Sequence, residues 1–291
     1  MTDLSRRRVT LLTEAHFALD GGAMFGIIPR PLWSRTNPPD DQNRIPMTAR
    51  CVLIEDGDRR ILIDVGIGTL WSEKERSIYA IEDQDTGLRG ALATCGTSPE
   101  EIDEVILTHL HFDHAGGLLH DDGHGPTPAF PRARHWLQHQ NWGWANAPSQ
   151  RDAGSYRKET FSFFDDADAP ELRLIDGVAE ILPGVQVLPA QGHTFGMQVV
   201  LIECADATYA FLADLIPTSS HLRAPYVMGY DLQPLVTVRE KQALLFDAAR
   251  HGWILLFEHD RDTPACRVEF DARDQPRPVP LTPAPGSLRI L

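Results

Sequence analysis

The stretch Thr108-His109-Leu110-His111-Phe112-Asp113-His114 places four side chains that can bind a metal ion within six residues. It follows the apolar run Glu104-Val105-Ile106-Leu107, which is typical of a buried strand. Residues two apart in an extended chain point to the same side, so His109 and His111 are expected to converge on one metal ion. The last two donors lie where the chain turns towards a helix and are expected to reach a second point nearby. Imidazole and carboxylate groups suit Zn²⁺ and similar divalent ions.

Three further donors follow apolar, strand-like runs elsewhere in the chain. They are His193, Asp214 and His259. The C-terminal ends of strands are where open α/β sheets gather ligands. A single histidine after a strand is more often a hydrogen-bonded loop residue, but together with the first cluster the metal-binding interpretation is favoured.

Strand and helix patterns alternate along most of the chain. Asp56-Gly57 between two apolar runs predicts a hairpin, and Ser98 with Glu101 predicts a helix start. The remaining expected elements are strands at Val185–Leu188, Met197–Glu203, Thr208–Ala213 and Trp253–Phe257, and a helix at Val238–Arg250 begun by a capping box of Thr237 and Glu240. This pattern favours an α/β fold in which two mixed sheets lie between helix layers, a four-layer αββα sandwich.

We expect one domain over residues 1–274, with an aromatic-rich insertion at about 120–176. In that insertion periodicity is poor, which predicts loops and short helices. The tail, residues 275–291, contains several prolines and is expected to be extended or loosely docked.

The net charge and the hydropathy pattern limit the classes of partner that the chain is expected to bind. The chain has 27 basic and 41 acidic residues, a formal net charge of −14, which argues against nucleic-acid binding. No apolar run approaches the length of a membrane span, and the segment after Arg6-Arg7-Arg8 is interrupted too early for a secretory signal. The expected location is therefore the cytoplasm, with no membrane partner.

The pattern HLHFDH at 109–114, followed by single His, Asp and His residues, resembles the metallo-β-lactamase superfamily over roughly residues 45–262. The resemblance implies two divalent metal ions, Zn by default with Fe, Mn or Co as alternatives. It implies that His109, His111 and His193 bind one ion, that Asp113, His114 and His259 bind the other, and that Asp214 bridges them. It also places Asp64 beside the site, where it would orient a ligand imidazole; a turn residue at a strand end is the alternative.

Within the superfamily the chain looks most like the N-acyl homoserine lactonases and methyl parathion hydrolase-like enzymes. The matching segments are Asp20–Gly26, Pro31–Trp33, His111–Gly117 and Ala213–Thr218. This resemblance implies a small lactone or ester substrate, attack by a metal-bridging hydroxide, proton transfer by Asp113, and a homodimer. A phosphotriesterase or general esterase is the alternative activity, and a non-catalytic metal-binding sensor is the alternative from another class.

One position departs from the lactonases of this fold, which carry a Tyr where this chain has Pro217. Tyr226, Tyr230 and His221 are the candidates to replace it. Met24, Phe25, Trp33 and His221 are the expected substrate contacts. With the aromatic residues of the insertion, the first three could line an apolar groove, or these side chains could instead belong to the core or to a subunit contact.

Overall fold

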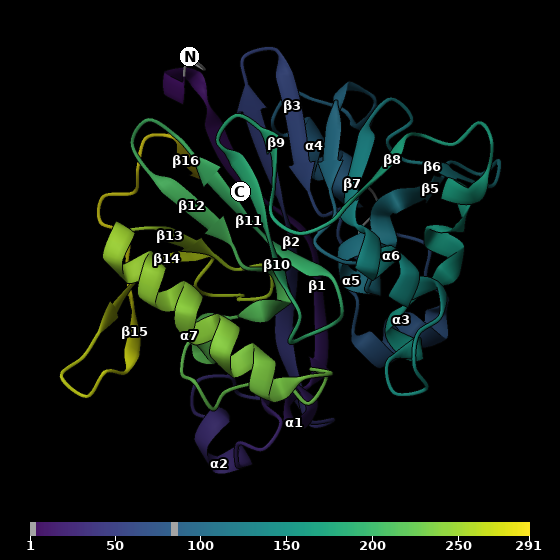
Figure 1. Cartoon of the computed structure of the whole chain (residues 1–291). Helices are drawn as coiled ribbons and strands as arrows, with labels where there is room; N and C mark the ends of the chain where they lie inside the picture. The colour runs from purple at the N-terminus through teal and green to yellow at the C-terminus, as the bar shows by residue number, and fades with distance from the viewer. Residues whose placement is uncertain (1–3, 83–86) are drawn as a thin grey trace. The chain divides into compact units, whose positions relative to one another are not determined.

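The computed structural model describes residues 4–82 and 87–291, and the chain divides into two compact units. The first, which we call the histidine-loop unit, contains Arg6–His16, Ala49–Gly177 and Leu288–Leu291. The second, which we call the C-terminal unit, consists mainly of Phe17–Thr48 and Val178–Ser287. Each unit is built around a seven-stranded mixed sheet with helices beside it (Figure 1). The expected α/β class with two mixed sheets and flanking helices is confirmed, whereas the expectation of one domain stays a prediction.

The first sheet places the histidine-rich loop at the end of a central strand. Its strand order is β16-β1-β2-β3-β4-β7-β8. The strands are β1 (Arg8–Asp20), β2 (Arg44–Asp56), β3 (Arg59–Ile63), β4 (Glu104–Ile106), β7 (Arg134–Gln138), β8 (Leu172–Ile175) and β16 (Leu288–Ile290). Strand β4 is parallel to both of its neighbours, β3 and β7.

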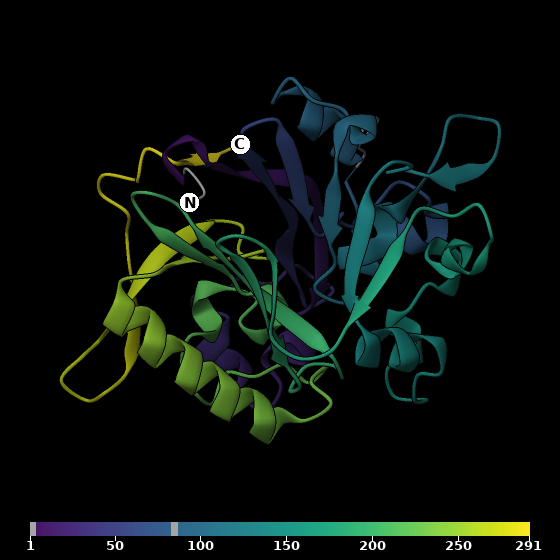
Figure 2. The same ribbon diagram turned by 45° about the horizontal axis from the view of Figure 1, so that its top comes forward.

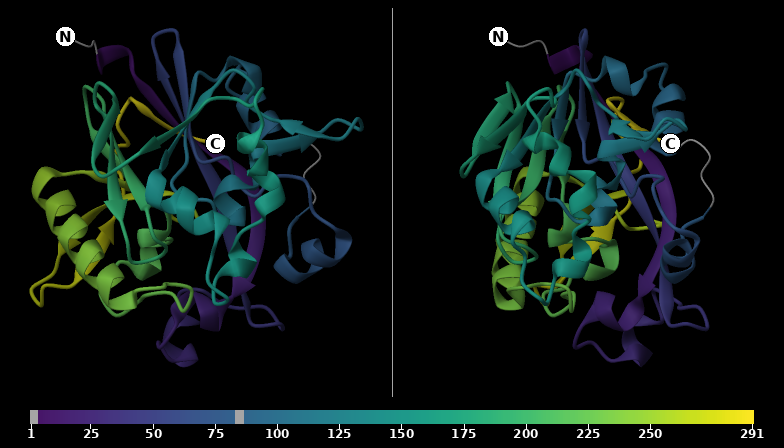
Figure 3. Two further views of the ribbon diagram at one scale, coloured as in Figure 1. Left: turned by 45° about the vertical axis from the view of Figure 1, so that its right-hand side comes forward. Right: turned by 90° about the vertical axis from the view of Figure 1, so that its right-hand side faces the viewer.

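Short helices and turns complete the histidine-loop unit. The helices are α3 (Glu73–Tyr79), α4 (Gly87–Ala93), α5 (Phe112–Ala115) and α6 (His139–Asn146), with 3₁₀ turns at Pro99–Glu101, Gly116–Leu118, Ala153–Ser155, Lys158–Thr160 and Ser162–Asp165. A further 3₁₀ turn, Leu4–Arg6, lies where the chain passes between the two units. The two-stranded ribbon of β5 (Leu119–Asp121) and β6 (Pro126–Pro128) projects from this unit (Figure 3).

The predicted hairpin is confirmed. Strands β2 and β3 pair antiparallel with Asp56 opposite Arg59, so Gly57 and Asp58 form the turn. Gly57 has a φ of +66°, a conformation that glycine adopts without the steric cost of a Cβ. The turn therefore fixes the register that buries the apolar residues of both strands.

The aromatic-rich segment contributes to the core of its own unit. Tyr156 and Phe161 are buried members of the hydrophobic cluster, and Trp142, Trp144, Phe163, and Phe164 pack against it. Two stretches expected to be irregular are the strands β7 and β8 of the first sheet. Their pairing partners lie far away in sequence, so local periodicity could not indicate them.

The second sheet has the order β15-β14-β13-β12-β11-β10-β9. Its strands are β9 (Ala179–Leu182), β10 (Val185–Ala190), β11 (Met197–Glu203), β12 (Thr208–Phe211), β13 (Ile254–Leu256), β14 (Ala265–Phe270) and β15 (Pro276–Val279). Helix α7 (Pro234–His251) contacts β14, and Figures 1 and 2 show it lying across this sheet. The unit also contains the helices α1 (Gly21–Phe25) and α2 (Arg30–Trp33) and 3₁₀ turns at Ala213–Leu215 and Ser219–His221.

Helix α7 begins earlier than the sequence predicted. Gln233 is its N-cap and Pro234 its first residue, so the expected capping box of Thr237 and Glu240 is wrong. Proline is favoured at the first helical position, where no N–H partner is needed. The carboxylate of Glu240 instead accepts hydrogen bonds from the backbone N–H groups of Gln191 and Gly192, at 2.8–3.0 Å.

The proline-rich tail is more ordered than expected. Pro276–Val279 pairs antiparallel with β14 as strand β15. Leu288–Ile290 pairs parallel with β1, as Figure 2 shows next to the C-terminus. Both strands lie at sheet edges. In β15 this position tolerates the two prolines, because one side of an edge strand makes no ladder bonds. Among the described residues, no helix is long and apolar enough to cross a membrane.

Neutral His135 makes the stability of the histidine-loop unit dependent on pH. His135 lies in β7, is 1% exposed, and contacts the rings of Phe130 and Phe164. Burial lowers its pKa to about 4, although hydrogen bonds to backbone groups of Glu171 and Ala133 oppose the shift. The unfolded chain, with a pKa near 6.5, therefore takes up this proton first as the pH falls. The stability contribution is complete above pH 6.5 and is lost between pH 6.5 and 4.

We expect His135→Phe to remove this loss while keeping an aromatic ring between the two phenylalanines. Between pH 7 and pH 4.5 the wild type should lose about 2 kcal/mol more unfolding free energy than the variant. Denaturant unfolding of both proteins at the two pH values measures the difference. Equal losses in both would show that His135 does not titrate as described.

Candidate metal centre

Strand β4 leads directly into the predicted metal-binding loop. His109, His111 and His114 are 0%, 6% and 0% exposed, and Asp113 is 5% exposed. His111 is the N-cap of α5, and its carbonyl accepts the backbone N–H of His114 at 3.1 Å. The change from extended chain to helix at His111 therefore sets the direction of the last two donors, as the sequence predicts.

Asp64 links this loop to the end of β3. Its Oδ1 accepts the N–H of Thr108 at 2.6 Å, and its Oδ2 accepts the Thr108 hydroxyl at 2.6 Å. The same Oδ2 lies 3.0 Å from Nδ1 of His114. Asp64 is fully buried and has a φ of +54°. A non-glycine residue in this region costs free energy and is found most often at functional sites.

The C-terminal unit carries the other three donors, all of them buried. They are His193 after β10, Asp214 after β12 and His259 after β13. Ala213 has a φ of +45°, and this tight turn precedes Asp214. The two carboxylate oxygens of Asp214 face different imidazoles: Oδ2 is 3.0 Å from Nε2 of His193, and Oδ1 is 3.1 Å from Nε2 of His259.

Oxygen atoms hold the imidazoles of His109, His114, His193 and His259 through Nδ1. The partners are Thr108 Oγ1 for His109 (3.1 Å), Asp64 Oδ2 for His114 (3.0 Å), Asp231 Oδ1 for His193 (2.9 Å) and the Thr48 carbonyl for His259 (2.8 Å). An Nδ1–H that donates to oxygen leaves the lone pair of a neutral imidazole on Nε2. This is the tautomer that metal-binding histidines use.

The carboxylates give the His193 environment a strong negative potential. Burial lowers the pKa of His193, but the charges and hydrogen bonds of Asp214 and Asp231 outweigh burial and raise it to about 9. Two buried carboxylates beside one imidazole therefore favour a positive charge at this place. A divalent cation satisfies the same demand.

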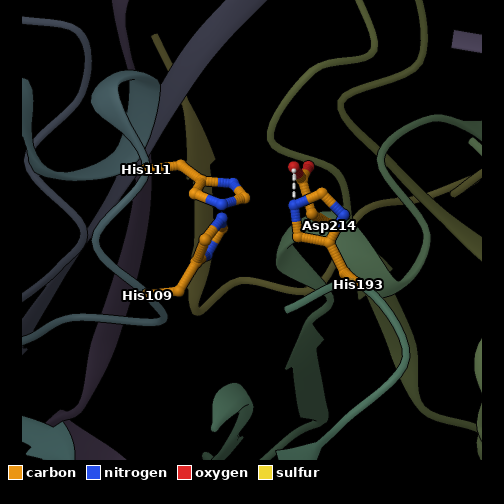
Figure 4. Close-up of side chains that lie close together, drawn as sticks. All are labelled: His109, His111, His193 and Asp214. Carbon is orange, nitrogen blue, oxygen red and sulfur yellow. Dashed lines mark ion pairs between the residues drawn. The ribbon is translucent and has the colours of Figure 1, made fainter. Parts of the chain in front are cut away.

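The donor atoms form close groups. Within the histidine-loop unit the ring centroids of His109 and His111 lie 4.5 Å apart, and within the C-terminal unit His193 and Asp214 form an ion pair. Figure 4 shows these four side chains with that ion pair. Also within the histidine-loop unit, Oδ1 of Asp113 lies 3.9 Å from Nε2 of His114.

These residues fit divalent metal ions. Seven titratable donors are buried, and buried charged groups are rare unless they are paired or bind metal. Nitrogen and carboxylate oxygen ligands with no sulfur suit zinc and its neighbours. The oxygen partners on Nδ1 are the outer support that metal-binding imidazoles usually have.

The expected substrate contacts lie in the C-terminal unit and contact one another. Phe25 is stacked between Trp33 and His221, with ring centroids 5.3 and 4.6 Å away. His221 bonds Thr218 through Nδ1 and the Met24 carbonyl through Nε2. Burial lowers its pKa to about 4, which makes it a neutral group at pH 7. All four residues are at most 1% exposed, and their role towards substrate stays a prediction.

Sequence reasoning missed Asp231. It lies in a loop before α7, 38 residues from His193, and no local motif marks it. It also missed Thr108 and the Thr48 carbonyl. The position of Thr108 directly before the first histidine could have indicated its role. The Thr48 carbonyl could not be found in this way, because every residue has a backbone carbonyl.

Comparison with known proteins gives a consistent family. The model of the metallo-beta-lactamase superfamily matches residues 44–280. An N-acyl homoserine lactonase of Bacillus cereus is 28% identical over 177 residues, which is 55% of this chain and 60% of the relative. This chain thus spans about three fifths of that relative's length. An N-acyl homoserine lactonase of Bacillus thuringiensis is 25% identical over 75% of this chain and 84% of the relative.

Solved structures agree in fold. A probable metal-dependent hydrolase from Staphylococcus aureus has a TM-score of 0.80 and 29% identity, covering 90% of this chain and 92% of its own. AidC, a dizinc quorum-quenching lactonase, has a TM-score of 0.77 at 18% identity, covering 96% of this chain and 95% of its own. The second likeness supports the fold alone.

Asp231→Asn should weaken metal binding. The amide of Asn carries no negative charge, so it is a weaker hydrogen-bond acceptor for Nδ1 of His193 than the carboxylate is. Loss of such an outer partner of a metal-binding histidine lowers metal affinity by about 10- to 100-fold. Competition with a chelator of known zinc affinity measures the change. Asp247→Asn, at an exposed position on α7, is the control and should leave the affinity unchanged. Equal affinity in both variants would contradict the role given to Asp231.

Proposed function

This chain belongs to the metallo-beta-lactamase superfamily, and from that membership we propose that it is a dinuclear metal-dependent hydrolase that opens lactones, with N-acyl homoserine lactones as the preferred class. The observation that carries the proposal is the set of buried imidazoles held through Nδ1, with their Nε2 atoms left as metal donors. The relatives named as N-acyl homoserine lactonases support the substrate class.

We assign the donors to two ions. His109, His111 and His193 hold one, Asp113, His114 and His259 hold the other, and Asp214 contributes to both. Contacts within the histidine-loop unit support this assignment, because the rings of His109 and His111 lie together and Asp113 lies beside His114. The two oxygens of Asp214 face different imidazoles, which supports the proposal that Asp214 binds both ions.

Divalent ions, with Zn²⁺ the first choice, would make a water molecule nucleophilic near neutral pH and polarise the lactone carbonyl. Water adds to the carbonyl carbon, the bond from that carbon to the ring oxygen breaks, and the ring oxygen leaves with a proton. Asp113 is the residue we assign to hold that proton. Its Oδ1 lies 3.9 Å from Nε2 of His114, so the carboxylate lies beside another ligand that we assign to the same ion.

An aromatic cluster beside Asp113 suits the apolar part of such a substrate. Phe112 contacts Trp71 and Tyr79, with ring centroids 5.4 and 5.0 Å away. Burial raises the pKa of Tyr79, and the nearby charge of Asp113 adds to the shift. Pockets for small molecules are mostly lined by such apolar and aromatic groups. We therefore propose this cluster, rather than the aromatic side chains of the 120–176 segment, as the contact for an acyl chain.

Removal of one proposed metal ligand tests the metal site. His109→Ala should lose bound metal and lower the rate of lactone hydrolysis by more than about 100-fold, because even outer supports of a metal cost up to that factor. His139→Ala, whose side chain is 65% exposed in the same unit, is the matched control. Metal analysis and the initial rate are measured on the same samples. A variant that loses metal but keeps its rate would refute the proposal.

A substrate panel tests the reaction class. On protein of measured metal content, N-hexanoyl and N-decanoyl homoserine lactones should be hydrolysed at least about tenfold faster, in kcat/KM, than γ-butyrolactone, because apolar contact with an acyl chain contributes to transition-state binding. A phosphotriester should be the slowest substrate. Preferred hydrolysis of the phosphotriester would replace the lactonase proposal with the alternative activity. No hydrolysis of any ester by metal-loaded protein would favour a binding role.

A further inference from the structure

Glu14 is a buried carboxylate directly behind the segment that begins with Asp64. It lies in β1, is 3% exposed, and its Oε2 accepts the backbone N–H of Ile67 at 3.0 Å. The backbone N–H of Gly68 also bonds this carboxylate. Two successive N–H groups of the segment are therefore held by one side chain that reaches them from another strand.

The other side of the same segment packs on the metal-binding loop without intervening side chains. The N–H of Val65 donates to the His114 carbonyl at 2.9 Å, and the N–H of Gly117 donates to the Gly66 carbonyl at 3.2 Å. A Cβ on Gly117 would lie 2.1 Å from the Val65 carbonyl oxygen. The two backbones thus move together, and a displacement of one displaces the other.

Glu14 also restricts the segment sterically. Gly66 has a φ of +72°, and a Cβ built there would lie 2.4 Å from Oε2 of Glu14. The carboxylate therefore lies in contact with the backbone at Gly66 as well as bonding the next two residues. The segment is held between Glu14 on one side and residues 114–117 on the other.

The location is an unfavourable one for a carboxylate. Burial raises the pKa of Glu14 to about 7, although the two backbone hydrogen bonds lower it. An apolar residue of similar length would avoid this cost but would leave two buried N–H groups without an acceptor. A role in placing the segment accounts for the choice of an acidic residue.

We propose that Glu14 is a positioning residue of the metal centre: by holding the N–H groups of Ile67 and Gly68, it fixes the 64–68 segment and, through it, Asp64 on Nδ1 of His114. The inference rests on the proposed function, because it assigns Glu14 to the metal site described above. Glu14 touches neither substrate nor metal in this account, and it acts through Asp64.

A pocket gives small molecules access to Glu14. It has a volume of about 220 Å³ and is lined by Glu14, Gly68, Gly117, Leu119 and His120, among others. When the side chain is shortened, a small carboxylate such as formate can enter and accept the same N–H groups. A general loss of folding would not be repaired in this way.

The test compares Glu14→Ala, Glu14→Gln and the exposed control Glu159→Ala by zinc affinity in competition with a chelator. Glu14→Ala should bind zinc about 10- to 100-fold more weakly than wild type, and millimolar formate should restore a large part of that loss. Glu14→Gln, which keeps one oxygen acceptor, should lose less. The control should match wild type, with and without formate.

Two results would overturn the inference. One is wild-type zinc affinity in Glu14→Ala. The other is weakened affinity that neither formate nor the glutamine variant repairs, accompanied by a lower melting temperature of the metal-free protein, which would show a role in folding alone. A wild type that binds zinc but hydrolyses no lactone would contradict the proposed function. The comparison of zinc affinities would still test the role of Glu14. A wild type that binds no divalent ion would overturn both.

Discussion

The interaction on which the site depends is the hydrogen bond between an imidazole Nδ1 and a fixed oxygen. Four histidines make it, to a threonine hydroxyl, two carboxylates and one backbone carbonyl. Each bond fixes a ring orientation, so the Nε2 atom is placed before any cation arrives. These four imidazoles are thus ordered during folding, and little of the binding free energy of a metal ion is needed to order them.

Both units use the same construction. An apolar strand ends, the backbone turns sharply, and a polar side chain follows. Asp64, after β3, has a positive φ itself, and Asp214, after β12, directly follows Ala213, which has a positive φ. These strained turns persist because the surrounding backbone hydrogen bonds over-determine them. In the histidine-loop unit, glycines at 66 and 117 allow the turn to pack directly against the metal-binding loop.

Local patterns were enough to predict the hairpin β2–β3, the strand before the histidines and the candidate donors themselves. They failed where a contact joins distant residues. Asp231 reaches His193 across 38 positions and Glu14 reaches Ile67 across 53, with no motif at either end. The tail strand β15 depends on pairing with β14, which a proline-rich sequence conceals. The start of α7 was placed too late because Thr237 imitates a cap, whereas Pro234 sets the first turn.

The number of zinc ions that each chain retains decides whether the buried donors form a dinuclear metal centre. Chain purified with excess zinc and passed through a desalting column should retain two zinc ions per chain by elemental analysis. The proposal assigns three ligands to each of two ions and has Asp214 contribute to both, so it requires this stoichiometry. Retention of no zinc by the folded wild-type chain would contradict the account, because the buried donors would then serve the fold alone.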